Sequence, residues 1–174
     1  MKNKLLSACL SVLLLFGCDD IEKMLTFQFT DQTAIRLESA MPLNLPLEVP
    51  TPAVTSNSRQ EFENHNTHAD LVKDVRLEQL KLTITDPSGK TFTFLKTIRI
   101  FISASDQSEI ELASLDNISA STGVIELTPT KQKLDPYVRA SAYDLRTEVT
   151  TDETLTEDID ILVDLKFRVT ADTF

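Results

Sequence analysis

The chain has 174 residues, three glycines, no tryptophan, two cysteines and a formal net charge of −10. This length suits one domain with a sizeable core. The acidic balance argues against nucleic-acid binding and against a domain that lies on an anionic bilayer. Only Gly89 and Gly123 follow residue 17, so no glycine-rich phosphate-binding loop is expected.

The N-terminus reads as an export signal. Lys2 and Lys4 precede an apolar run, Leu5–Phe16, that would reach about 18 Å as a helix, short of the roughly 30 Å hydrocarbon core. A basic start, a short apolar centre and a small residue at the end predict a secretory signal peptide over residues 1–17.

The end of this run, Leu15-Phe16-Gly17-Cys18, resembles the lipobox of bacterial lipoproteins, the signal peptidase II type. Leu15, Gly17 and Cys18 fit the pattern, while Phe16 is larger than the residue usual there. The resemblance implies cleavage before Cys18, lipidation of its sulphur, acylation of the new amino group and a membrane anchor. The alternative is an ordinary signal peptide with an incidental cysteine, although exported proteins rarely keep one unpaired thiol at their first position.

Residues 18–24 are expected to form the lipidated anchor and a short polar leader. The acidic pair Asp19 and Asp20 has two possible interpretations as a sorting signal. It resembles a signal for retention in the inner membrane in one group of bacteria and a signal for surface export in another. A cell-envelope location is expected, with the outer membrane favoured and the surface or periplasmic face left open.

Alternating apolar residues predict short strands over Leu25–Thr30 and Ala34–Glu38. In Leu43–Val49 the apolar residues occupy every second position, with prolines between them. Because proline cannot donate to a sheet ladder, this segment is expected to be an edge strand or an extended crossover that packs its leucines inward. A helix is expected from Ser58 as N-cap to near Val72, with a second turn of helix around Asp135–Tyr137.

Val75–Thr85 is expected to be a strand with a β-bulge near Glu78-Gln79. The turn signal Asp86-Pro87-Ser88-Gly89 predicts that this strand folds back onto Thr91–Leu95. Further strands are expected at Ile98–Ile102, Ile110–Ala113 and Val124–Leu127.

The strongest alternation, Ile159–Val169, is expected to pair with Tyr143–Val149 in a long antiparallel hairpin. The whole pattern predicts an all-β fold over residues 25–174, an antiparallel, immunoglobulin-like β-sandwich of about nine strands with one short helix. From Leu80–Thr85 to the Thr150–Thr154 turn, the arrangement also resembles small Gram-negative lipoproteins of unknown function, which implies no activity.

Two clusters are candidate metal sites, each with a plainer explanation. His65 and His68, flanked by carboxylates, could share a helix face, or be solvated loop residues. Asp152 and Asp158 belong to an acidic tip that could offer oxygen ligands, or simply discourage edge pairing. No catalytic residue is assigned, because there is no nucleophile motif and both histidines lie in one segment.

The sequence therefore favours a membrane-anchored, non-catalytic binding or structural module of the cell envelope, with no cofactor. Its expected partner is an envelope protein or an external ligand, because loops on a rigid sandwich are frequent recognition sites. The alternative functions are a carrier that holds an apolar ligand between the sheets, beneath Leu43–Val49, and a periplasmic hydrolase with converging carboxylates.

Overall fold

The computed structural model describes residues 25–173. The predicted signal peptide, the lipobox residues Leu15, Phe16 and Gly17, and the lipidation site Cys18 lie outside the described residues. The elements, in chain order, are β1 (Leu25–Leu37), β2 (Leu47–Val49), β3 (Val54–Thr55), α1 (Ser58–Asn64), β4 (Val72–Asp86), β5 (Leu95–Ala104), β6 (Gln107–Asp116), β7 (Val124–Pro129), α2 (Asp135–Val138), β8 (Ala142–Thr151) and β9 (Ile159–Ala171). A 3₁₀ turn, Phe92–Phe94, precedes β5.

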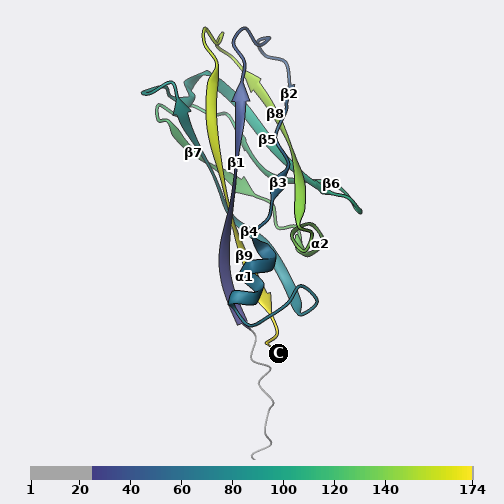
Figure 1. Ribbon diagram of the computed structural model, residues 1–174. Coiled ribbons are helices and arrows are strands. Elements are labelled where there is room, and N and C mark those ends of the chain that lie inside the picture. The colour runs from purple at the N-terminus through teal and green to yellow at the C-terminus, as the bar shows by residue number, and fades with distance from the viewer. Residues whose placement is uncertain (1–24, 174) are drawn as a thin grey trace, which may run out of the picture.

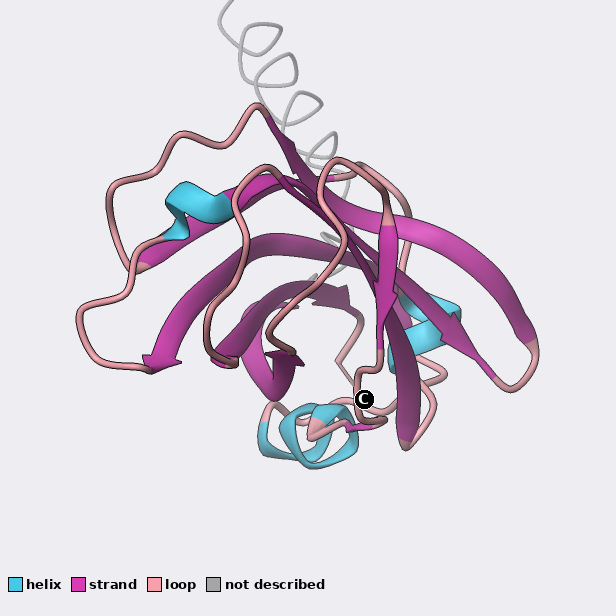
Figure 2. Cartoon of the chain, turned by 90° about the horizontal axis from the view of Figure 1, so that it is seen from above, coloured by secondary structure: helices cyan, strands magenta, loops and turns pink. Residues whose placement is uncertain are grey.

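The nine strands form one sheet in the order β1-β9-β4-β7-β6-β5-β8-β2, and β3 also pairs with β8. Every strand pair is antiparallel. The sheet curls around a shared interior (Figure 2). Its edge strand β1 contacts β2 and β3 at the other edge. The predicted all-β antiparallel class is confirmed. The immunoglobulin-like sandwich is not confirmed, because the strands belong to one continuous curled sheet.

The interior is built on β9, which lies between β1 and β4. The predicted alternation of this strand is confirmed, since its inward side chains are fully buried: Ile159, Ile161, Val163, Leu165, Phe167 and Val169. Burial of each such side chain stabilises the fold by about 1.5–3 kcal/mol. The Phe167 ring stacks on Phe29 of β1 at 5.1 Å and meets Tyr143 of β8 edge-on at 6.2 Å. The core therefore joins strands from both sides of the curl.

The predicted hairpin between Tyr143–Val149 and Ile159–Val169 is wrong. β8 pairs with β5, β2 and β3, whereas β9 pairs with β1 and β4. The segment between them crosses the end of the curled sheet and is held by Leu155, which is 2% exposed. Each strand has one buried face, as the alternation indicated, but two strands that face the same interior need not be neighbours.

β1 is a single strand where the sequence predicted two. It pairs with β9 without a register shift from Leu25 to Leu37. Asp31, which interrupts the apolar pattern, stays in phase with Phe27 and Phe29 and is 1% exposed. The carboxylate therefore faces the interior, where two hydrogen bonds compensate its burial. The strand thus continues through the position at which the sequence predicted a gap between two strands.

β4 carries the predicted bulge, a register shift against β9 between Leu77 and Gln79. The predicted return of the chain along β4 is wrong, because β4 pairs with β7 and β9 instead. The turn is closed one residue later than expected, by the Lys90 amide donating to the Pro87 carbonyl at 3.3 Å. Phe92 and Phe94 then enter the core from a 3₁₀ turn, in which they are 0% and 1% exposed.

The first predicted helix is shorter than expected and starts differently. α1 ends at Asn64, and Asn66 follows with a positive φ of 53°. Asn57, not Ser58, is the N-cap residue. The Ser58 hydroxyl instead donates to the Val138 carbonyl at 2.6 Å, which ties α1 to the second predicted helix, α2.

Candidate functional site

The two histidines predicted as candidate metal ligands have different surroundings. His65, at the C-terminal end of α1, stacks its ring on Phe27 at 4.1 Å between centroids. His68 lines a shallow surface hollow with Arg59, Glu63 and neighbouring residues. The structure thus gives His65 an aromatic packing partner on β1.

The two acidic residues predicted as candidate metal ligands, Asp158 and Asp152, also have different surroundings. Asp158 accepts hydrogen bonds from the Ser39 amide at 2.8 Å and from Arg36 at 2.9 Å. These bonds, the backbone one first, hold the pKa of Asp158 below its usual value. Asp152 is exposed, and its amide donates to the Phe94 carbonyl. Across residues 25–173, no group of three or more histidine, cysteine or acidic side chains is placed to hold a metal ion.

A hollow with several buried apolar side chains lies at one end of the curled sheet, where the chain leaves β1 and enters β2. This distal groove has a volume of about 410 Å³. The loop between β1 and β2, which lines it, lies at the top in Figure 1, at the end of β1 opposite Leu25. Its lining residues are Arg36, Glu38, Ser39, Ala40, Met41, Pro42, Leu47, Glu48, Val49 and Pro50.

The loop that forms the groove is fixed by backbone contacts to distant parts of the chain. Ala40 and Asn44 have positive φ values of 62° and 55°, which reverse the chain direction within a few residues. The Ala40 amide donates to the Leu155 carbonyl at 3.0 Å, and the Asn44 amide donates to the Thr151 carbonyl at 2.7 Å. The Lys96 ammonium donates to the Asn44 side chain at 3.2 Å. The groove is therefore preformed.

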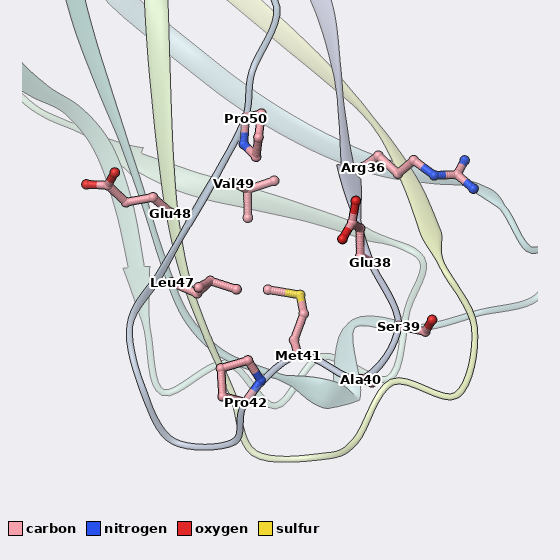
Figure 3. A pocket seen from close by; sticks show the side chains of 10 residues that line it. All are labelled: Arg36, Glu38, Ser39, Ala40, Met41, Pro42, Leu47, Glu48, Val49 and Pro50. Carbon is pink, nitrogen blue, oxygen red and sulfur yellow. The ribbon is translucent and has the colours of Figure 1, made fainter.

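Apolar side chains make the floor of the distal groove. Met41 and Val49 are 8% and 5% exposed, and Leu47 is half-buried. Figure 3 shows the ends of Met41 and Leu47 pointing toward one another, with Pro42 below them and Val49 above. Such a floor offers van der Waals contact to an apolar group but no reactive atom.

The charged residues at the groove differ in their partners. Arg36 turns away from the groove (Figure 3) and bonds Asp158 and Asp160, which raises the pKa of its guanidinium. Glu48 forms an ion pair with Arg146 at 3.1 Å. Glu38 is exposed and has no ion-pair partner among residues 25–173. The rim therefore carries one uncompensated carboxylate beside an apolar floor.

The sequence identified the Leu43–Val49 segment and correctly predicted that Leu47 and Val49 pack inward, but it assigned Leu43 and Leu45 wrongly. β2 is an edge strand, as expected, yet it includes only Leu47–Val49. Leu43 and Leu45 are 42% and 59% exposed instead of packed inward. The left-handed conformation of Asn44 breaks the extended alternation, so the leucines before β2 turn toward solvent. Met41 and Glu38, which complete the groove, were not singled out by any sequence pattern.

Among the described residues, no helix is long and apolar enough to cross a membrane. No family model matches this chain, and no curated protein matches it in sequence.

Proposed function

We propose that this protein is a lipid-anchored, non-catalytic binding module of the cell envelope, with the distal groove as its recognition site. Cys18 carries the lipid after removal of residues 1–17, as the lipobox resemblance implies. The observation that carries the proposal is a preformed groove with an apolar floor, next to exposed leucines in the chain, at the end of the domain opposite the predicted anchor.

The position of the groove supports this reading. β1 begins at Leu25, seven residues after Cys18, and runs for 13 residues to Leu37 beside the groove. At about 3.4 Å per residue, the strand covers roughly 40 Å. A domain tethered at Cys18 would thus present the groove on the side away from the bilayer.

The chemistry of the groove indicates what it would bind. Met41, Leu47 and Val49 offer an apolar floor, and the exposed Leu43 and Leu45 extend the apolar surface around it. Glu38 adds a carboxylate without an ion-pair partner in the described part of the chain. A partner protein that inserts an apolar side chain next to a lysine or arginine satisfies both features.

The alternative function, a carrier of an apolar ligand, is retained only for this groove. A volume of about 410 Å³ is within the range of small-molecule pockets, roughly 300–1,000 Å³. The interior of the curled sheet is less suitable, because its side chains, including Phe167, Leu80 and Ile100, are fully buried against one another.

For location we propose the outer membrane. Asp19 and Asp20 resemble a signal for retention in the inner membrane as well as a signal for surface export, so they are compatible with a domain on the periplasmic side and with one on the cell surface. Protease treatment of intact cells, with lysed cells as the control, separates the two faces. Digestion of the domain on intact cells indicates surface display, and survival until lysis indicates the periplasmic side.

The binding function is tested by photo-crosslinking in living cells. A photoreactive amino acid replaces Leu45 beside the groove or, as the control, Gln60 on α1 near the opposite end. Both side chains are exposed, so neither replacement disturbs the core. The proposal predicts one discrete crosslinked protein from position 45 and none of that size from position 60.

Charge reversal at the groove provides a second criterion. Glu38→Lys is expected to weaken the crosslink from position 45, whereas Glu63→Lys, the same change on an exposed residue of α1, leaves it intact. Equal crosslinking from positions 45 and 60, or equal effects of the two reversals, would contradict the proposed recognition site. Labelling of an extractable small molecule instead of a protein would favour the carrier.

A further inference from the structure

A second hollow, on the outer face of the sheet, has the opposite charge to the chain as a whole. This proximal hollow has a volume of about 400 Å³ and is lined by Asp74, Arg76, Leu77, Thr130, Lys131 and Arg168. Three of these residues are cationic and one is acidic, in a chain of net charge −10. Lys133 adds a further cation, with its ammonium 3.8 Å from Asp74.

The strand register concentrates this charge. Arg76 on β4 and Arg168 on β9 are directly opposite each other. Like charges in this position repel and destabilise a sheet unless they are neutralised. Asp74 accepts two hydrogen bonds from Arg76 Nε, at 2.9 and 3.0 Å. Its single charge cannot also neutralise Arg168, which is exposed and has no ion-pair partner between residues 25 and 173.

The surroundings hold the hollow in shape. Arg76 also donates through Nη1 to the Lys131 carbonyl, which fixes the loop after β7 against β4. The buried Asp135 accepts a hydrogen bond from the Val75 amide at 3.4 Å, and its charge also interacts with Arg76. Asp74 and Asp135 contribute two negative charges, which do not balance the four positive charges of Arg76, Lys131, Lys133 and Arg168.

The hollow lies toward the anchored end of the domain. Arg168 is three residues before Ala171, which pairs with Leu25, so it is about 10 Å along the strand from that end. The chain from Cys18 to Leu25 spans at most about 25 Å. A domain tethered through Cys18 can therefore bring this face to the lipid headgroups by tilting.

We propose that the proximal hollow binds the phosphate of anionic lipid headgroups in the membrane that holds the anchor. Arg168 and Lys131 supply the charge, and Arg76 supports them. This contact tilts the domain on the membrane and fixes the direction in which the distal groove points. The proposed contact modifies the prediction, made from the net charge, that the domain does not lie on an anionic bilayer. A local basic site can bind an anionic surface even though the rest of the chain is acidic. The inference rests on the proposed anchoring.

The test uses the lipidated protein, isolated from cells and reconstituted into vesicles. Since the only cysteine after residue 17 is Cys18, an added cysteine gives a unique attachment point for a spin label. Gln132→Cys places the label on the exposed loop beside the hollow, and Leu45→Cys places it at the distal end. Electron paramagnetic resonance then measures collisions of each label with a nickel chelate on the lipid headgroups.

Label 132 is expected to collide with the chelate more often in vesicles that contain phosphatidylglycerol than in vesicles of phosphatidylcholine alone. Label 45 is expected to show no increase. The increase is lost in Arg168→Gln and at high salt, because each cation near an anionic surface changes the bound population about fivefold. Lys90→Gln, which removes a cation paired with Glu157 just before β9, far from the hollow, leaves the increase unchanged.

Equal collision rates in the two kinds of vesicle, or an increase that Arg168→Gln does not reduce, would overturn the inference. So would a response to added inorganic phosphate without any response to phosphatidylglycerol, which would indicate a site for a free anion. Failure of the anchor itself gives a different result, because the protein would then not remain on phosphatidylcholine vesicles at all.

Discussion

The hydroxyl of Tyr143 on β8 donates a hydrogen bond of 3.0 Å to the carboxylate of Asp31 on β1. The other oxygen of Asp31 accepts a bond of 3.1 Å from the Asn57 amide at the start of α1. β1 and β8 are far apart in the strand order and meet only because the sheet curls. This buried contact therefore fastens the curl where no backbone ladder joins its edges.

We expect Asp31→Ala and Tyr143→Phe each to lower the free energy of unfolding by about 1–3 kcal/mol, because each leaves a buried polar group without its partner. The double variant should lose less than the sum of the two, since the second change removes a group that is already unpaired. Urea unfolding of the four proteins measures this coupling. Strict additivity would show that the contact does not stabilise the curl.

The same contact predicts a dependence on alkaline pH. Burial, followed by the nearby charge of Asp31, raises the pKa of Tyr143 far above its ordinary value. The folded protein therefore keeps the proton that the unfolded chain releases above about pH 10. This stability is fully present below pH 10 and is lost as the pH rises, by up to about 1.4 kcal/mol per pH unit.

The measurement is urea unfolding at several pH values between about 9 and about 11. Tyr143→Phe is the reference, because it keeps all other alkaline titrations. The stability difference between wild type and variant should shrink as the pH rises. A constant difference across this range would mean that the hydroxyl titrates alike in both states.

Phe167 is predicted to be a main support of the core. It is fully buried on β9 and contacts Phe29 and Tyr143 from opposite sides of the curl. Phe167→Ala should cost about 3–5 kcal/mol, because it removes apolar contact and leaves a cavity. Thr30→Ala, an exposed change on β1, should stay within about 0.5 kcal/mol. Thermal and urea unfolding compare them, and similar losses would contradict the assigned core.

At the distal end, the pKa of Asp158 is expected to depend on both of its partners. The Ser39 amide is the larger cause of its lowered pKa, and Arg36 is the next. Arg36→Gln should raise this pKa only part of the way to its ordinary value, because the Ser39 bond remains. Its stabilising contribution is present above the unfolded pKa, about 3.9, and is lost as the pH falls. Carbon-detected NMR titration of the carboxyl group provides the measurement, and an unchanged pKa would contradict the assignment.

The sequence predicted which residues face the interior better than it predicted which strands are neighbours. The alternation in β9 correctly identified its buried face, because that pattern is local. The pairing of β9 with β1 depends on contacts across the whole chain, as between Leu25 and Ala171. Asp31 shows the limit: it was left between two predicted strands, because the partner that satisfies it inside the core, Tyr143, is 112 positions away.

The distal groove was only partly predictable, for a similar reason. Leu43–Val49 stood out as an unusual edge, but the groove forms because Ala40 and Asn44 adopt left-handed conformations. Their amides are held by the carbonyls of Leu155 and Thr151, more than a hundred residues later in the chain. The proximal hollow likewise needs the register that places Arg76 opposite Arg168.

The proposed anchor at Cys18 defines which end of the domain is distal and which hollow can meet the membrane. The most direct test is the intact mass of the mature protein from cells, for the wild type and for Cys18→Ala. We predict a wild-type chain that begins at Cys18 and carries acyl groups, and a variant without them. An unacylated wild-type chain that begins at another residue would contradict the account.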